Sequence, residues 1–299
     1  MNGPPIVFDR ALLALRRKRA LAAPSDFLLA HVVEDIVERL GAVQRDFGLA
    51  ADIGTPLSTL AAALAATGRV GRVVWLAPSA AAAAGHAGDA VVGDEETLPF
   101  ADESLDLAVS ALSLHFVNDL PGALAQIRRA LRPDGLFLGA LLGGETLREL
   151  GESLVAAEAE VTGGVSPRVA PFVEVRAAGG LLQRAGFALP VVDQDRLTVR
   201  YADPLALMRD LRAMGAGNVL AERVRAPLRR DVLIRALSIY AERFADPDKR
   251  IRATFDVISL SGWAPHESQQ KPLRPGSART RLADALGAVE RPAGEKAGG

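Results

Sequence analysis

Apolar residues recur along this chain with two spacings, one typical of amphipathic helices and one typical of buried strands. Residues 8–19 and 27–40 carry apolar side chains at helical spacing, with Pro24 between them, which predicts two helices near the N-terminus. From about residue 49 to residue 142, short apolar runs alternate with helical segments. Continuous apolar runs are typical of strands buried on both faces, so this alternation predicts an α/β fold with a parallel sheet between helices.

The strands expected in this sheet occur at regular intervals. They are residues 49–53, 70–76, 89–92, 105–112 and 136–142, and the clearest helices between them are 58–66 and 120–131. Ligands of open parallel sheets bind beyond the carboxyl ends of the strands. Functional side chains are therefore expected in the loops that follow the strands. These loops are residues 54–58, 76–79, 93–100, 113–119 and 142–146.

The second half of the chain predicts more helices and a return to the sheet. Helices are expected at 147–161, 173–185, 203–214 and 228–244, an antiparallel hairpin at 188–192 and 197–200, and a last strand at 251–261. The polar, proline-rich segment 262–277 follows, and the final residues lack a packing pattern and are expected to be disordered. We divide the chain into an N-terminal helical lid (1–48), a cofactor-binding core (49–200), a helical insertion with the last strand and a polar arm (201–278), and a tail (279–299).

Composition limits the class of protein. The 35 basic and 36 acidic residues nearly balance, which removes a general electrostatic case for nucleic acid or an anionic membrane. Without cysteine there is no disulfide, thiolate metal site or cysteine nucleophile, and the four histidines show no metal-ligand spacing. No apolar run approaches the ~18 residues of a membrane span. The basic cluster 16–19 follows the apolar segment 11–15, the reverse of a secretory signal. These features predict a cytoplasmic protein without a metal or a membrane span.

Two motifs resemble those of class I S-adenosylmethionine (SAM)-dependent methyltransferases. The first is Gly93-Asp94-Glu95-Glu96-Thr97-Leu98-Pro99-Phe100, followed by the strand that begins at Ser104. The second is the turn Leu131-Arg132-Pro133-Asp134-Gly135. The resemblance implies a Rossmann-like, mostly parallel seven-stranded sheet and SAM as the cofactor.

Three further segments resemble a narrower family, that of respiratory complex I assembly factor 5. They are Phe8-Asp9-Arg10, the block Gly143-Gly144-Glu145-Thr146-Leu147-Arg148-Glu149-Leu150, and the tail 262–277. This resemblance implies a protein substrate, a complex I subunit on which the eukaryotic member hydroxylates an arginine. A more distant similarity is to the malonyl-carrier-protein methyltransferase of biotin synthesis, which implies methyl transfer instead.

The resemblance places part of a SAM site after the first strand, where the family has an acid followed by three glycines at alternate positions. Glycines there let the backbone approach the amino-acid part of SAM. Asp52 and Gly54 match this pattern, whereas Pro56 and Ser58 replace the next two glycines. We expect Thr55, Ser58 and the following helix N-terminus to contact the ligand in altered geometry. An ordinary strand-to-helix turn is the alternative.

The loops after the next strands supply the other cofactor positions that the resemblance implies. Ala77 stands where the family usually has an acid that accepts from both ribose hydroxyls, so SAM binding is expected to be weakened. Asp94 stands where an acid accepts from the adenine amino group, and Glu95 follows beside the ring. Ser113 opens the loop after the fourth strand.

The remaining candidates concern catalysis and the substrate. His115 follows the fourth strand and suits proton transfer or polar positioning, although a packed, structural histidine is the alternative. Glu145 and Thr146 end the fifth strand at the same edge, where Glu145 is the second catalytic candidate and helix capping is their alternative role. Arg10 and residues 16–19 are expected to solvate one helix face, and the alternative is that Arg10 folds over the ligand carboxylate as part of an N-terminal lid. The polar arm is expected to lie across the site or on a protein partner through Trp263, His266 and Gln269, and a disordered tail is the alternative.

Two functional classes remain open at this stage. One is a SAM-utilising enzyme that methylates or hydroxylates its substrate. The other is a non-catalytic assembly or binding protein on a methyltransferase scaffold. Pro56, Ser58 and Ala77 favour this class, because they depart from the SAM-binding pattern.

Overall fold

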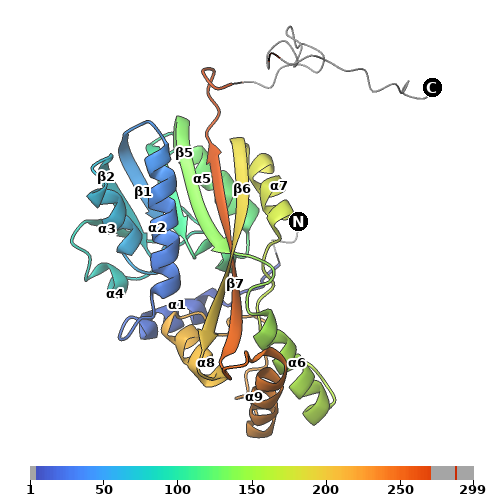
Figure 1. The fold of residues 1–299 in the computed structure, drawn as a ribbon. Coiled ribbons are helices and arrows are strands. Elements are labelled where there is room, and N and C mark those ends of the chain that lie inside the picture. Colours follow the sequence, from blue (N-terminus) through green and yellow to red (C-terminus); the bar gives the residue numbers. More distant parts are fainter. Residues whose placement is uncertain (1–4, 271–286, 288–299) are drawn as a thin grey trace. The chain divides into compact units, whose positions relative to one another are not determined.

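A twisted seven-stranded sheet organises the chain in this computed structural model, which describes residues 5–270 and Gly287 (Figure 1). The strand order is β3-β2-β1-β4-β5-β7-β6. The strands are β1 (Phe47–Ile53), β2 (Val70–Ala77), β3 (Asp89–Val92), β4 (Leu105–Ala111), β5 (Leu131–Leu142), β6 (Ala188–Tyr201) and β7 (Ile251–Trp263). The first five are parallel, and β7 inserts antiparallel between β5 and β6. The predicted α/β fold with a mostly parallel sheet is confirmed.

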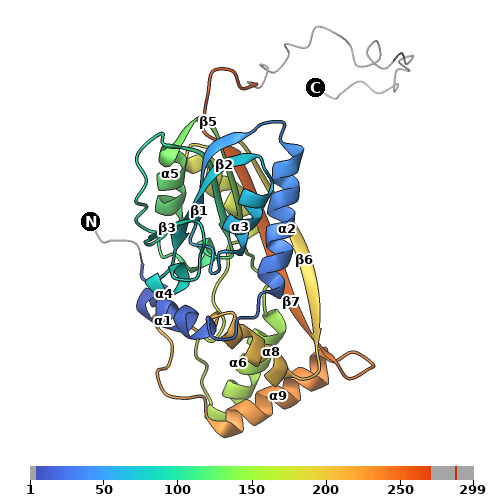
Figure 2. The ribbon, with the colours of Figure 1, turned by 90° about the vertical axis from the view of Figure 1, so that its left-hand side faces the viewer.

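Helices cover both faces of the sheet because each contributes one apolar stripe to it. On one face lie α2 (Phe27–Ala42), α3 (Thr59–Ala66) and the short α4 (Ala80–Ala83), and on the other lie α5 (Leu120–Ala130) and α7 (Val175–Arg184) (Figures 1 and 2). The residues of α2 pack with inward-facing residues of β4 and β5 into one core cluster, and those of α5 and α7 join a second. The central strands are buried on both sides, as their continuous apolar runs predict.

A second group of helices lies beyond the carboxyl ends of the parallel strands. It consists of α1 (Arg10–Ala20), α6 (Arg148–Thr162), α8 (Pro204–Ala213) and α9 (Arg230–Phe244), at the lower end of the molecule in Figure 1. These helices belong to the same compact unit as the sheet, Met1–Pro265. They therefore enclose the edge of the sheet where ligands of this architecture bind. No helix in the described part of the chain is long and apolar enough to cross a membrane.

The hairpin predicted at residues 188–192 and 197–200 is wrong. One continuous strand, β6, runs through both segments and pairs with β7 along its length. The polar run between them is typical of a turn by composition, but β6 is an edge strand with exposed positions, so polar side chains are tolerated there. Two of them also find partners, because Arg196 pairs with Asp256 directly across the ladder and Asp193 with Arg39 of α2. The predicted disordered tail (279–299) and the end of the polar arm (271–278) lie outside the described residues, Gly287 excepted.

Candidate functional site

The loops after β1, β3 and β4 meet at the centre of the sheet edge, where the strand order reverses between β1 and β4. Gly54 ends β1 with a φ of +71°, a conformation that favours glycine. A Cβ added to Gly54 would lie 2.4 Å from Oε1 of Glu95 and 2.6 Å from its Cδ. The carboxylate of Glu95 therefore occupies the space that the missing side chain leaves open.

Glu95 is the centre of a buried ionic cluster, with only 3% of its surface exposed. Arg10 and Arg17 of α1 both form ion pairs with its carboxylate, the Arg17 Nη1 to Glu95 Oε1 distance being 3.3 Å. The hydroxyl of Ser113, at the end of β4, donates to the same carboxylate. Arg10 also pairs with Asp94 at 2.8 Å, so one helix spans both acids of the loop after β3.

Burying the charged carboxylate of Glu95 is unfavourable, and the positive charges of the cluster offset this cost. Burial alone would raise the pKa of Glu95, but the Arg17 and Arg10 guanidinium groups and the Ser113 hydroxyl together lower it to about 2. Glu95 is therefore ionised throughout the physiological pH range. A charge-neutral arrangement of two arginines and two acids holds α1 over the loop that follows β3.

Asp52, in contrast, has no cation beside it. It is fully buried, its Oδ1 accepts a hydrogen bond from the Thr55 hydroxyl, and its Oδ2 has no partner among the described residues. Burial raises the pKa of Asp52 to about 7, although hydrogen bonds from Thr55 act to lower it. Asp52 and Thr55 therefore shape the turn from within, because Thr55 also accepts from the backbone N–H of Ala111 and ties β1 to β4.

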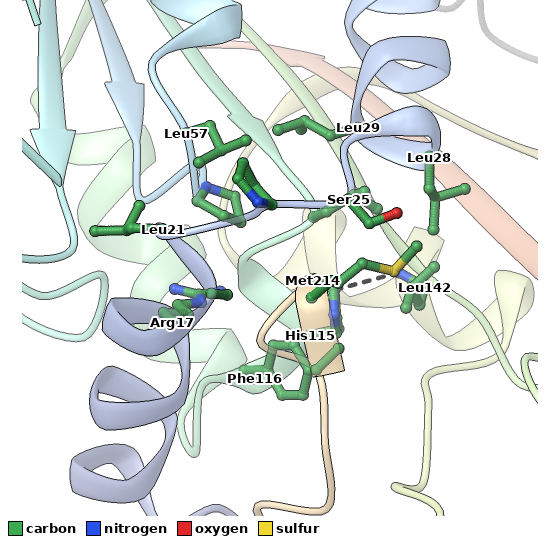
Figure 3. A pocket seen from close by; sticks show the side chains of 16 residues that line it. Arg17, Leu21, Ser25, Leu28, Leu29, Leu57, His115, Phe116, Leu142 and Met214 are labelled. Atoms are coloured by element: carbon green, nitrogen blue, oxygen red, sulfur yellow. Dashed lines mark hydrogen bonds between the residues drawn. The ribbon is translucent and has the colours of Figure 1, made fainter. Parts of the chain in front are cut away.

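His115 lies in a short 3₁₀ turn after β4 and lines a small apolar cavity with Arg17, Pro56 and Leu57 (Figure 3). The backbone N–H of Leu142 donates to its Nδ1 at 3.4 Å, which leaves the proton of the neutral ring on Nε2. Burial and the nearby Arg17 charge lower the pKa of His115 to about 3. A ring that stays neutral fits the polar positioning role better than proton transfer.

The other predicted cofactor residues line the same turn region without forming ligand-like groups. Ser58 precedes α3, but its side chain makes no capping hydrogen bond. Ala77 is fully buried in a small cluster with Ala61 and Trp75, so an acid is absent there in space as well as in sequence. Pro56 and Leu57 turn towards the His115 cavity.

Glu145 and Thr146 are not brought to this cavity. The Thr146 hydroxyl donates to the backbone oxygen of Asp256 at 3.2 Å and accepts from its N–H at 3.1 Å, which fastens the loop after β5 to β7. Glu145 pairs with Arg148 at 3.2 Å, and neither Glu145 nor Thr146 lines the His115 cavity or the larger cavity next to it. The expected helix N-cap role is also absent, because Leu147 precedes α6.

The placement of Trp263 at the site is wrong. Trp263 ends β7 and pairs with Leu136 and Ala188, at the end of the sheet opposite the carboxyl ends of β4 and β5. The reason is the antiparallel direction of β7, which carries the chain away from the site. His266 and Gln269 belong to the following segment, where the His266 N–H donates to the Gln269 side chain at 3.2 Å. Their role in binding stays a prediction.

Arg17 is the residue that sequence reasoning assigned wrongly, as part of a solvated basic run. It is 7% exposed, and its guanidinium group also lies 5.7 Å from the centre of the Phe116 ring. The available signal was its spacing from Arg10. Residues seven apart lie on the same face of a helix two turns away, so the face that carries Arg10 to the site carries Arg17 as well.

Comparison with known proteins adds independent information on this fold and site. A family model described as a methyltransferase domain matches residues 51–139, which contain Gly54, the acidic loop and Ser113. The YcgJ protein from Bacillus subtilis shares the fold, with a TM-score of 0.53, 15% identity and coverage of 79% of this chain and 99% of its own. Sheet order, matched domain and structural neighbour together show a methyltransferase fold, as the motifs predicted.

Two relatives match almost the whole chain. Arginine-hydroxylase NDUFAF5, mitochondrial, from Danio rerio is 38% identical over 288 residues, which cover 93% of this chain and 89% of the relative. The protein of the same name from Homo sapiens is 39% identical over 302 residues, covering 97% and 86%. The chain belongs to the family of the arginine-hydroxylase NDUFAF5 proteins. A malonyl-acyl-carrier-protein O-methyltransferase from Xylella fastidiosa (strain M23) is 39% identical over 175 residues, covering 58% and 57%.

These relatives bear names of enzymes, so the non-catalytic alternative is not favoured. The similarity to complex I assembly factor 5 that the motifs suggested is likewise confirmed at the level of the family.

Proposed function

We propose that this enzyme binds SAM at the sheet edge beside Gly54 and modifies an arginine side chain of a protein substrate, a subunit of respiratory complex I. The observation that carries the proposal is the similarity to arginine hydroxylases over 93% of the chain, together with a matched methyltransferase domain that contains Gly54 and the acidic loop. The names of the relatives supply the arginine and the hydroxylation. The complex I subunit comes from the resemblance of the segments 8–10, 143–150 and 262–277.

The residues of the cleft fit SAM, provided that Glu95 leaves the space over Gly54. Asp94, about half exposed, would accept from the adenine amino group. Arg10 and Arg17, released from Glu95, would pair with the carboxylate of SAM. When bound, SAM would supply an electrophilic methyl group on its sulfonium centre. The protein's own contribution is to hold the ligand, exclude water under α1 and place the Nε2–H of His115 beside the cavity as a hydrogen-bond donor.

The first test is a calorimetric titration of the full chain with SAM, with S-adenosylhomocysteine as the comparison. We expect micromolar binding and a loss of affinity on the order of tenfold or more in Asp94→Ala, because that variant removes the acceptor for the adenine. A well-folded sample that shows no heat at millimolar SAM would contradict the cofactor part of the proposal.

The second test concerns the reaction. Complex I is isolated from cells with and without this chain, and its arginines are mapped by mass spectrometry, which distinguishes an added oxygen atom from an added methyl group. An arginine modified only in the presence of the chain supports the proposal. Identical arginines in both samples would contradict it. The cytoplasmic location also stays a prediction, since the two NDUFAF5 relatives are named as mitochondrial.

A further inference from the structure

A large cavity lies between α1, α6 and α8. Its volume is about 730 Å³, against about 70 Å³ for the neighbouring cavity that His115 lines. The two share walls at Phe116, Leu142 and Met214, so the large cavity adjoins the candidate site directly. The large cavity is therefore wide enough for a substrate segment, whereas the His115 cavity is not.

The interior of this cavity is apolar. Leu147, Leu150 and Leu154 contribute from the α6 side, Leu211 from α8, and Phe255 from β7. Side chains of this kind bind apolar groups by excluding water, as in most ligand sites.

Its rim is strongly basic. Arg16 and Arg19 of α1 face Arg209 and Arg212 of α8 around the cavity, and all but Arg16 are exposed. Within the described part of the chain none of these four has an ion pair or a side-chain hydrogen bond, whereas Arg168, also in the wall, is bound to Glu158 at 2.6 Å.

Arg16 is close enough to Arg19 and Arg212 for their charges to repel it. Burial lowers the pKa of Arg16, and the neighbouring charges of Arg223, Arg19 and Arg212 lower it further. The guanidinium group of Arg16 lies against Gly217, in the space that a Cβ at this position would enter. The whole chain carries a net charge of −1, which makes this accumulation a local feature of the cavity.

We propose that the cavity binds an acidic segment of the protein substrate, whose carboxylates contact Arg16, Arg19, Arg209 and Arg212 and whose apolar side chains enter between α1, α6 and α8. This inference rests on the proposed function, because it assumes a protein substrate. The four arginines of the rim favour an acidic polypeptide segment over a small amphiphile as the ligand. A small amphiphile with one anionic head would pair with one or two arginines, whereas an acidic polypeptide segment offers one carboxylate to each. Acidic neighbours would also offset the repulsion between this rim and the target arginine of the substrate.

The test is fluorescence anisotropy with the full chain and two labelled synthetic peptides. In one peptide, glutamates and leucines surround a single arginine, and in the other lysines replace the glutamates. We expect the glutamate peptide to bind more tightly by at least about tenfold, with an affinity that falls as salt is added.

The variant Arg209→Glu/Arg212→Glu is expected to weaken binding of the glutamate peptide by about tenfold or more. The matched control is Arg176→Glu/Arg184→Glu on α7, which changes the charge equally at two exposed arginines that line neither cavity. Circular dichroism confirms that both variants fold. Equal binding of the two peptides, equal loss in both variants, or displacement of the glutamate peptide by decanoate at equimolar concentration would overturn the inference.

The outcome is separable from that of the proposed function. Peptide binding that depends on Arg209 and Arg212, without any modification of arginine in complex I, leaves the acidic docking site standing and removes the reaction. Modification of complex I that proceeds unchanged in Arg209→Glu/Arg212→Glu overturns the docking site and leaves the reaction intact.

Discussion

At the scale of single residues, Glu95 and Gly54 share one function. The glycine leaves a space above β1, and the carboxylate of Glu95 enters it with Arg10, Arg17 and Ser113 as partners. A ligand that bound on Gly54 would have to displace this carboxylate and could then use the same arginines. Under the proposed function, Glu95 would therefore occupy the place of the SAM carboxylate until the ligand binds.

The variant Glu95→Gln tests this role. It leaves the buried Arg17 without its counter-charge, so the free energy of unfolding is expected to fall by about 3 kcal/mol or more. Added SAM should then raise the melting temperature more than in the wild type, because its carboxylate can pair with the released arginines. Urea denaturation and thermal unfolding with and without SAM provide the two readouts.

Asp94→Asn is the matched control, since Asp94 shares Arg10 with Glu95 but its side chain is 49% exposed. Its effect on unfolding is expected to stay below about 1 kcal/mol. Equal losses in the two variants would contradict the assignment of Glu95 as the buried centre of the cluster.

The sequence can reveal a site residue when the motif that marks it lies within a few neighbouring positions. Asp52, Gly54 and Asp94 lie in motifs in which spacing within a loop carries the information, and the structure places Gly54 against Glu95, the neighbour of Asp94. The partners of Glu95 come from α1, 78 positions away in the case of Arg17, and no spacing rule relates them. The arginines of the large cavity lie on α1 and α8, far apart in sequence, so they meet only through the fold.

At the scale of elements, α1 depends on contacts on both sides. The backbone N–H groups of Val7 and Phe8 both donate to Asn118 Oδ1 at 2.8 Å, and the N–H of Asp9 donates to Val219 O at 2.8 Å. The Asp9 side chain caps α1 by accepting from Leu12 N–H at 2.9 Å. The helix that carries Arg10 and Arg17 is thus connected to the loop after β4 and to the segment after α8.

We expect Asn118→Ala to loosen α1, because two partly buried backbone donors lose their acceptor, at a cost of about 1–3 kcal/mol. Hydrogen exchange followed by mass spectrometry should show faster exchange in residues 7–20. The control is Asp119→Ala, which removes the acceptor of the Gly122 N–H at the start of α5, 2.8 Å away. Faster exchange of α1 in the Asp119 variant, or none in the Asn118 variant, would contradict this connection.

Helices and strands could be predicted where the hydrophobic period is regular. They could not be predicted where pairing with other strands determines the structure. The buried strands β1, β4 and β5 and the helices around them follow from their apolar runs. Edge strand β6 has no such run, and its polar centre is held by pairing with β7 and by Arg39 and Asp256. The direction of β7, which moves Trp263 away from the site, depends on tertiary pairing with β5 and not on its own sequence.

At the scale of the whole molecule, two buried groups act on stability in opposite directions as pH changes. His115 has a pKa of about 3 in the folded chain against an ordinary value of 6.5, so the unfolded chain binds more protons between these values. Its contribution to stability is therefore lost as pH falls below 6.5. Asp52 has a folded pKa of about 7 against 3.8, so the folded chain binds more protons in that window and stability is lost as pH rises through it.

Single variants separate the contributions of His115 and Asp52. A substitution whose other effects do not depend on pH changes the free energy of unfolding by the same amount at every pH, so only the lost titration changes the slope against pH. Between about pH 7 and about pH 5, the wild type should lose about 2 kcal/mol relative to His115→Gln, and should gain about 2 kcal/mol relative to Asp52→Asn. Urea denaturation at the two pH values measures both differences. If neither difference changed with pH, the two groups would titrate alike in the folded and unfolded chains, and the neutral state assigned to His115 would be wrong. Differences of opposite sign would show that His115 stays uncharged beside the cleft at physiological pH, as a hydrogen-bond donor there requires.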